Sequence, residues 1–200
     1  MTVLQPRPDG RHQRSTRTRA AILAAHWGLI VEGQFSPTTS RIAEAAGVSP
    51  RTFFSHFPDL ETLFVATTDA VYEEILSRRR WVEVCLPLGA RTDEFLAWRV
   101  DLYVFLTPFS LATRWREQKS AVLRERRMTI AVASLDDVAT TFAPELDQFP
   151  VGQRAGVVAT LETCTTWSTW YHLAEELGLG SAAARQAMHR LVLQVLEVRA

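Results

Sequence analysis

The chain has 200 residues, of which 47% are hydrophobic and 22% charged, and its formal net charge is zero. This length and apolar content suffice for a well-buried core in one large or two small domains. The zero net charge argues against a protein that binds nucleic acid with its whole surface. Two cysteines exclude a disulfide framework. Because neither a run of about 18 apolar residues nor a signal peptide is found, we expect a cytoplasmic protein without a membrane span.

The charges are unevenly distributed along the chain. Residues 1–57 contain seven arginines and three acidic residues, a balance of +4. The remaining residues contain 15 basic and 19 acidic groups, a balance of −4. A basic amino-terminal segment on an acidic body favours DNA binding by one end of the molecule only.

The polar segment 1–15, interrupted by prolines and a glycine, predicts a disordered basic arm. Its arginines can reach an adjacent minor groove, as basic arms of other DNA-binding proteins do. The alternative is a solvated tail. A first helix is expected from about Thr16 to Val31, with Leu23, Trp27 and Ile30 on one face.

Residues 38–57 predict two short helices separated by a tight turn. Thr38 is suited to cap the first helix, because its hydroxyl can accept a hydrogen bond from a free backbone amide. Gly47 follows that helix, where glycine adopts a left-handed conformation most easily. Ser49 and Pro50 then favour a second helix start. Two helices joined in this way form a helix-turn-helix, whose second helix can enter a DNA major groove.

Residues 42–57 read Ile-Ala-Glu-Ala-Ala-Gly-Val-Ser-Pro-Arg-Thr-Phe-Phe-Ser-His-Phe. This segment resembles the DNA-binding signature of the tetracycline-repressor-like (TetR) family of transcriptional regulators, and the resemblance extends over about residues 18–64. Phe54 and Leu60 depart from the family pattern, which usually has tyrosine and lysine there, both commonly facing the DNA backbone. The resemblance implies a double-stranded DNA operator as partner and a phosphate contact for His56.

The candidate DNA-binding residues lie on these two helices and at their caps. Arg51 is near the start of the second helix, where side chains meet base edges, and arginine pairs well with guanine. The alternative is a solvated surface arginine. Phe53 and Phe57 are interpreted as core. The candidate set is Thr38, Thr39, Ser40, Arg41, Ser49, Pro50, Arg51, Thr52, Phe54, Ser55 and His56.

The remainder of the chain predicts helices only, so the fold class is all-α with about nine helices. Asp59 should cap the fourth helix, and Arg78 to Arg80 should complement the dipole of its last turn. The later helices are expected at 59–80, 92–107, 109–119, 120–142, 152–177 and from Ser181 onward. The expected domains are a basic arm (1–15), an amino-terminal three-helix helix-turn-helix DNA-binding domain (16–64) and a carboxy-terminal helical effector-binding and dimerisation domain (65–200).

Catalytic chemistry has no support in the sequence. The five histidines are scattered, and no metal-binding or phosphate-binding motif is present. Adjacent acidic pairs such as Glu73 and Glu74 point apart on a helix, so they do not assemble paired carboxylates. We therefore expect no catalytic residue, no metal ligand and no cofactor.

The family resemblance implies an effector pocket in the second half of the chain. Its candidate lining residues are Trp98, Tyr103, Phe105, Met128, Trp167, Trp170, Tyr171 and His172. Such a lining would suit an apolar or aromatic small molecule, whereas the alternative for each aromatic residue is packing in the core.

The resemblance also implies a homodimer formed by the last two long helices, 152–177 and the one from Ser181. The second of these carries an apolar stripe: Ala184, Met188, Leu191, Val192 and Val195. The alternative is that this stripe packs within its own subunit.

Our interpretation is a homodimeric repressor released from a palindromic operator by a small effector. One rival is a DNA-binding regulator without a small-molecule effector, either controlled by a protein partner or constitutive. The other is a helical enzyme or interaction module whose helix-turn-helix is vestigial.

Overall fold

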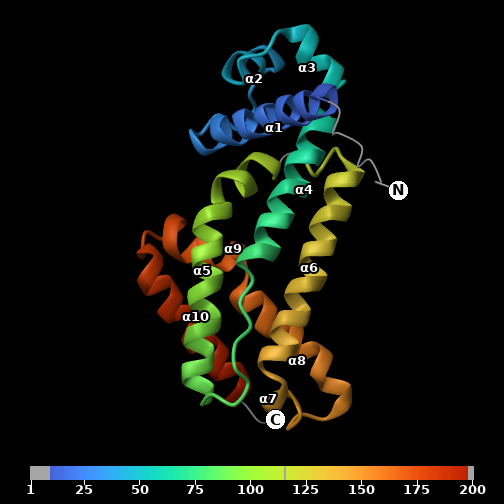
Figure 1. Ribbon diagram of the computed structural model, residues 1–200. Coiled ribbons are helices and arrows are strands. Elements are labelled where there is room, and N and C mark those ends of the chain that lie inside the picture. The colour runs from blue at the N-terminus through green and yellow to red at the C-terminus, as the bar shows by residue number, and fades with distance from the viewer. Residues whose placement is uncertain (1–9, 115, 198–200) are drawn as a thin grey trace, which may run out of the picture. The chain divides into compact units, whose positions relative to one another are not determined.

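The computed structural model describes residues 10–114 and 116–197, with side chains from residue 13 onward. Every regular element in these ranges is helical (Figure 1), which confirms the predicted all-α class. In chain order the elements are α1 (Gly10–Val31), α2 (Thr39–Ala45), α3 (Pro50–His56), α4 (Leu60–Arg78), α5 (Leu88–Thr113), α6 (Ala121–Thr141), α7 (Ala143–Leu146), α8 (Val151–Thr165), α9 (Trp167–Tyr171), a π-helical turn (His172–Glu176) and α10 (Gly180–Glu197).

The helices form two compact units. Unit 1 comprises the described residues up to Val71 together with Pro108–Arg124. Unit 2 comprises Tyr72–Thr107 together with the described residues from Glu125 onward. The segment 108–124 belongs to unit 1, whereas the expected second domain begins at residue 65 and includes this segment. Its side chains contact α1, α4 and the loop before α2, and these contacts account for the assignment.

The core of unit 1 joins the first four helices. Its buried residues are Ile22, Leu29, Ile42, Ala43, Phe53, Phe57 and Leu63. The predicted core role of Phe53 and Phe57 is confirmed, because both side chains are fully buried. Burial of such aromatic rings supplies much of the stabilisation available to a small helical unit.

Helix α1 begins earlier than expected. It starts at Gly10 rather than near Thr16, so residues 10–15 are helical and do not belong to a disordered arm. No proline follows Pro8 in this region, and the Thr18 hydroxyl donates to the Arg14 carbonyl at 3.0 Å, one turn earlier. The rest of the expected arm, residues 1–9, lies outside the described residues.

Helix α5 passes through a proline. We expected it to end at Thr107, yet it continues to Thr113 with Pro108 inside it. The Thr107 hydroxyl donates to the Tyr103 carbonyl at 2.7 Å, and Phe109 and Ala112 are buried beyond the proline. Burial of these side chains offsets the hydrogen bond that proline cannot donate. The expected separate helix 109–119 is therefore wrong.

The expected helix 152–177 is broken at Thr166. This residue is extended (φ −71°, ψ 160°), and its hydroxyl caps α9 by accepting from the Thr169 amide at 3.2 Å. Threonines 163, 165 and 166 have low helix propensity, because their branched side chains lose rotamers and their hydroxyls compete for backbone groups. Gly178, with φ +69°, follows the π-helical turn where a stop was predicted, and Gly180, also with positive φ, begins α10.

Helix α5 is, within the described ranges, the one helix long and apolar enough to cross a membrane by length and composition. Half of that apolar window is buried inside the protein, and Arg91 and Arg99 of the same helix are buried with polar partners. Its residues up to Thr107 contribute to the core of unit 2.

Helix α10 directs its apolar stripe into the core of its own unit. Ala184, Met188 and Val192 are completely buried there, and Leu196 is 7% exposed. Leu191 is 37% exposed, and Val195 packs partly against the core. Most of the stripe that we expected at a dimer interface is therefore covered within the subunit.

Candidate nucleic-acid interface

The two short helices α2 and α3 begin and end at the predicted signals. The Thr38 hydroxyl accepts a hydrogen bond from the Arg41 amide at 3.3 Å, which caps α2. Gly47 has φ +64°, the left-handed conformation expected of it. The Ser49 hydroxyl accepts from the Thr52 amide at 3.1 Å, and Pro50 is the first residue of α3. These caps satisfy amides that would otherwise lack partners at each helix start.

Arg19 of α1 fixes the end of α3. Its guanidinium lies 4.3 Å from the centre of the Phe57 ring, and Nη1 donates to the His56 carbonyl at 3.2 Å. The bond satisfies a carbonyl at the carboxyl end of α3, where a positive charge is also favourable. In the sequence Arg19 is only one of the arginines of a basic segment, because no local pattern predicts a contact across 37 positions.

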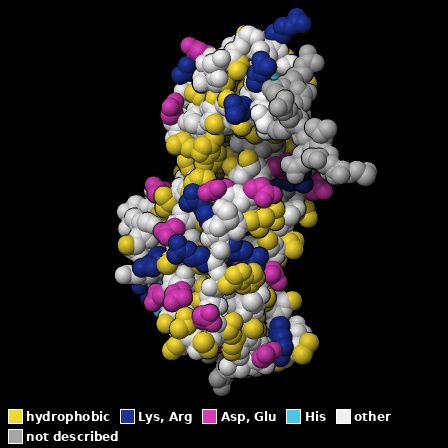
Figure 2. All heavy atoms as spheres, viewed as in Figure 1, with side chains coloured by type: hydrophobic (Ala, Val, Ile, Leu, Met, Phe, Trp, Pro, Cys, Tyr) yellow, Lys and Arg dark blue, Asp and Glu magenta, His cyan; other side chains and the backbone are white. Residues whose placement is uncertain are grey.

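The candidate DNA-binding residues lie at the surface of α2, α3 and their caps, and we call this surface the α2–α3 face. Figure 2 shows Lys and Arg side chains at the surface of the part that contains these helices. The exposed candidates are Thr38, Ser40, Arg41, Ser49, Pro50, Arg51, Phe54 and Ser55, and the partly buried ones are Thr39, Thr52 and His56. Every candidate therefore retains surface that a ligand can contact.

The polar candidates differ in whether they already have partners. Arg41 forms an ion pair with Glu44 at 2.9 Å, four-fifths of a helical turn away. The Thr52 hydroxyl lies 2.9 Å from that of Ser49, and the Ser55 hydroxyl donates to the Thr52 carbonyl at 2.7 Å. Arg51 forms no hydrogen bond or ion pair with another described residue. Its charge is thus available at the first turn of α3 without breaking an existing contact.

The two departures from the TetR pattern have different environments. Phe54 is 50% exposed and its ring meets Phe53 edge to face at 5.4 Å. Leu60 is partly buried and packs against the core of unit 1. Phe54 therefore offers an apolar surface on the α2–α3 face, whereas Leu60 contributes to the support beneath it.

A buried histidine connects α1 to α4. His26 is fully buried, and its Nδ1 lies 2.8 Å from the hydroxyl of Thr67, which itself donates to the Leu63 carbonyl at 2.9 Å. Since the threonine proton is used on Leu63, Nδ1 of His26 carries the proton of their shared bond. Burial, together with the positive charge of Arg116, lowers the pKa of His26 to about 4. The imidazole is therefore neutral at pH 7.

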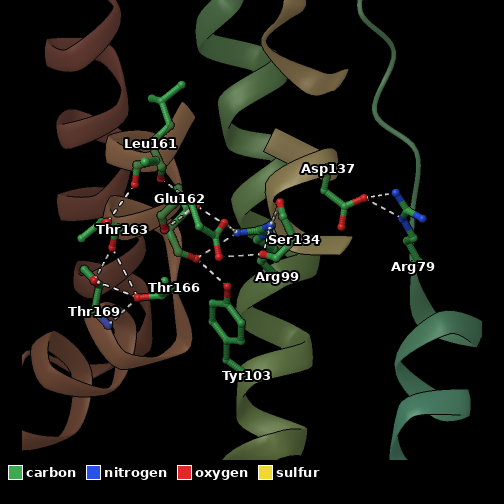
Figure 3. A network of polar contacts seen from close by, with 12 residues as sticks. Arg79, Arg99, Tyr103, Ser134, Asp137, Leu161, Glu162, Thr163, Thr166 and Thr169 are labelled. Atoms are coloured by element: carbon green, nitrogen blue, oxygen red, sulfur yellow. Dashed lines mark hydrogen bonds and ion pairs between the residues drawn. The ribbon is translucent and has the colours of Figure 1, made fainter. Parts of the chain in front are cut away.

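Unit 2 contains a buried polar network centred on Arg99 of α5 (Figure 3). Its guanidinium donates to Glu162 at 3.1 Å, to the Thr165 hydroxyl at 2.9 Å and to the Ser134 hydroxyl at 2.6 Å. The Tyr103 hydroxyl donates to the Thr165 carbonyl. Burial raises the pKa of Tyr103 to about 12, so its hydroxyl keeps the proton. These bonds join α5, α6 and α8 around one buried charge.

The eight candidate effector residues do not share one environment. Trp98, Tyr103 and Trp170 are buried, and the Trp170 indole donates to Ser181 at 3.3 Å. Phe105, Trp167 and Tyr171 are partly buried. Met128 is 63% exposed, and His172 is exposed with Nδ1 2.7 Å from Glu176. The structure therefore brings some of these residues into the core and leaves Met128 and His172 at the surface.

Trp98 is a buried aromatic residue whose indole N–H group lacks a hydrogen-bond acceptor among the described residues. A buried N–H group without an acceptor is unfavourable by about 1–3 kcal/mol.

Of the three arginines predicted for the last turn of α4, Arg78 lies in that turn, whereas Arg79 and Arg80 lie past the helix. The helix ends at Arg78, which pairs with Glu74 at 2.7 Å and lies over the Phe105 ring at 4.2 Å. Arg79 lies past the helix and pairs with Asp137 of α6, as Figure 3 also shows. A specific ion pair between two elements thus accounts for Arg79, in place of a general interaction with the helix dipole.

Residues 22–67 match the family model described as "Bacterial regulatory proteins, tetR family". The match begins within α1, spans α2 and α3 and ends within α4. It therefore covers the elements that build and support the α2–α3 face. No curated protein matches the chain significantly.

Proposed function

The chain belongs to the TetR family, whose members are DNA-binding transcriptional regulators and not enzymes, and from this membership we propose that it is a homodimeric repressor. In this proposal it acts in the cytoplasm and leaves a palindromic operator when a small apolar or aromatic effector binds to unit 2. The observation that carries the proposal concerns Arg51 at the start of α3. Its side chain is exposed and forms no hydrogen bond or ion pair with another described residue. The start of α3 is the position from which a recognition helix reaches base edges.

A dimer is proposed because one helix-turn-helix contacts only a short stretch of DNA. Two copies related by symmetry read two half-sites and so recognise a palindrome. Helix α8 exposes Ala155, Ala159 and Thr163 along one side, and α10 packs beside it. Small exposed residues allow a second pair of helices to approach closely. We propose that α8 and the exposed part of α10, including Leu191, form the dimer contact.

The proposed effector would act by shifting the population of two states. An effector that binds one state better than the other favours that state by its difference in binding energy. The unpaired indole N–H of Trp98 supports an effector that carries a hydrogen-bond acceptor on an aromatic or apolar body. Helix α4 contributes residues to both units, so we propose that its movement changes the spacing of the two α2–α3 faces.

Operator binding is tested by selection of DNA from a random double-stranded library with the full-length protein. We expect enrichment of a palindrome whose half-sites are separated by about one helical turn or a multiple of it. A hydroxyl-radical footprint on the selected DNA should show protection related by the same symmetry. Recovery of unrelated sequences after repeated rounds, with binding that does not depend on sequence, would contradict the proposal.

A regulator without a small-molecule effector is the second candidate. It is favoured by the Arg99 network, whose donors and acceptors are occupied by protein groups, and by the surface positions of Met128 and His172. The two candidates are separated by a panel of aromatic compounds tested for release of the selected operator. A compound that releases wild type but not Trp98→Phe supports the effector, whereas a panel without any releasing compound favours the second candidate.

A further inference from the structure

The end of α5, the start of α6 and the described residues between them form the segment 108–124, which packs within unit 1. Phe109 meets the Trp27 ring of α1 with 6.0 Å between ring centres. The Ser120 hydroxyl donates to the Glu61 carboxylate of α4 at 2.8 Å. These contacts involve two of the helices that surround the core beneath the α2–α3 face. The segment 108–124 is thus a structural part of the DNA-binding unit, although it lies outside the helix-turn-helix sequence.

Arg116 makes the most specific contacts in this segment. Its guanidinium lies 3.9 Å from the centre of the Phe64 ring of α4. Its Nη2 also donates to the Ser36 hydroxyl at 3.3 Å, in the loop between α1 and α2. One planar side chain therefore connects a fully buried ring in the core to the loop that leads into α2. An arginine guanidinium can stack on a ring and donate a hydrogen bond at the same time. A lysine ammonium lacks the planar group that stacks on the ring.

Ser36 lies close to the start of α2, so the contact with Arg116 affects the position of that helix. Pro37 follows Ser36 and is buried, and Thr38 then caps α2 through its hydroxyl. The backbone between Ser36 and the first turn of α2 is consequently short and constrained by proline. A displacement of Ser36 would move the start of α2, and the α2–α3 face would move with it.

The same ring has a second contact, an aromatic one with a histidine of α1. His26 meets Phe64 edge to face with 4.4 Å between ring centres. Phe64 thus contacts both α1, through His26, and the segment 108–124, through Arg116. Loss of Arg116 would leave one face of this ring without its contact and the Ser36 hydroxyl without its donor.

We propose that Arg116 is a positioning residue for DNA recognition: it fixes the loop before α2, and with it the α2–α3 face, without contacting DNA. The proposal deepens the operator binding proposed above and rests on it. A direct phosphate contact by Arg116 is the competing explanation, and the salt dependence of operator binding distinguishes the two.

The test compares the full-length protein with Arg116→Ala, Arg116→Lys and Ser36→Ala, and uses the selected operator at several salt concentrations. We expect Arg116→Ala to weaken operator binding by about three- to thirty-fold. The slope of log affinity against log salt should stay as in wild type, because a contact to phosphate contributes about 0.9 to that slope and a positioning residue contributes none. Ser36→Ala should weaken binding in the same direction, with no further loss in the double variant.

Arg114→Ala is the matched control, since Arg114 is exposed in the same segment. Its operator affinity should remain within about twofold of wild type. Arg116→Lys should recover less than half of the lost binding free energy, because lysine keeps the charge without the planar stacking. Unchanged affinity in Arg116→Ala would overturn the proposal, and so would a reduced salt slope, which would identify a phosphate contact.

A second readout does not require DNA. Amide hydrogen exchange of residues 33–41 should accelerate in Arg116→Ala and not in Arg114→Ala, because the loop before α2 loses its tether. Equal exchange in the two variants would overturn the proposal even if wild type bound no operator. Absence of operator binding by wild type with accelerated exchange would instead count against the proposed function alone.

Discussion

At the scale of single residues, Phe54 occupies a position where the TetR family usually has tyrosine. Its side chain is half exposed on the α2–α3 face. We expect Phe54→Tyr to strengthen operator binding by about two- to tenfold, because a new hydrogen bond to phosphate contributes about 0.5–1.5 kcal/mol. Fluorescence anisotropy with the selected operator measures this change. Weaker binding in the variant would show that the apolar ring itself contacts DNA.

Leu60 is the second departure from the family pattern. Here we expect the family's usual residue, lysine, to be unfavourable for stability. Its side chain packs against the core of unit 1, so Leu60→Lys exchanges apolar contact for a charge. We expect a loss of about 1 kcal/mol in the free energy of unfolding, measured by urea denaturation. Unchanged stability would indicate that Leu60 contributes no packing there. Leu60→Met is the control, since a similar apolar volume is retained.

The residues that could be predicted from the sequence are those whose partners are close in the chain. Thr38 and Ser49 accept from amides three positions later, and Gly47 adopts its conformation for local steric reasons. Arg19 and Arg116 could not be assigned, because their partners lie 37 and 80 positions away. A long-range contact of this kind leaves no periodic or capping signal in a single sequence.

At the scale of secondary-structure elements, the Arg99 network holds α5, α6 and α8 together. Glu162→Gln removes the carboxylate that faces the buried guanidinium while keeping the size of the side chain. We expect this variant to lose about 3 kcal/mol of stability, because removal of one partner leaves a buried charge uncompensated. Thermal and urea unfolding measure the loss. A change below about 0.5 kcal/mol would show that the remaining polar groups compensate the charge of Arg99.

Glu176→Gln is the matched control for Glu162→Gln. Glu176 pairs with His172 at 2.7 Å, and both side chains are at least half exposed. Exposed pairs contribute little, so the control should change stability by less than about 0.5 kcal/mol.

The contact of His26 between α1 and α4 predicts how the stability of unit 1 depends on pH. The pKa of His26 is about 4 in the folded state, whereas the unfolded chain has the ordinary histidine pKa of 6.5. The unfolded chain therefore binds the proton more strongly than the folded protein. The contribution of His26 to the free energy of unfolding is fully present above pH 6.5 and is lost as the pH decreases toward 4. We expect a loss of about 2–3 kcal/mol over this interval. His26→Gln should show a smaller loss between the same two pH values by urea unfolding, whereas an equal loss would contradict this assignment.

The elements that were mispredicted are those in which distant contacts outweigh local preference. Pro108 normally ends a helix, yet α5 continues because Phe109 and Ala112 are buried beyond it. Thr166 interrupts a segment whose apolar residues favoured one long helix. At this break the carbonyl of Thr165 accepts from Tyr103 and Arg99, which lie more than 60 positions earlier. Neither outcome follows from helix propensity alone.

At the scale of the whole molecule, the proposed dimer predicts the effect of a charge placed on α8. Ala159 is exposed on that helix, so Ala159→Arg should leave the subunit folded. We expect the variant to sediment as a monomer and to bind the operator at least about 100-fold more weakly, because two linked contacts exceed one by that order. Ala131→Arg, at an exposed position of α6, is the control and should stay dimeric. A dimeric Ala159→Arg variant would place the contact elsewhere.

The division into units could be anticipated only in part. The helix-turn-helix was recognised from residues 42–57, and the family match covers 22–67. The segment 108–124 belongs to the same unit because of Phe109, Arg116 and Ser120, whose contacts arise only when the chain is folded. The apolar stripe of α10 was also ambiguous, because burial within a subunit and burial between subunits produce the same periodicity.

The central claim is that the α2–α3 face reads DNA sequence through Arg51. Fluorescence anisotropy at one fixed salt concentration should compare wild type, Arg51→Ala and the exposed-arginine control Arg80→Ala on the selected operator and on a scrambled duplex. We predict that Arg51→Ala loses at least about tenfold on the operator, with little change on the scrambled duplex, while Arg80→Ala binds both as wild type does. Equal operator affinity for Arg51→Ala and wild type would contradict the account.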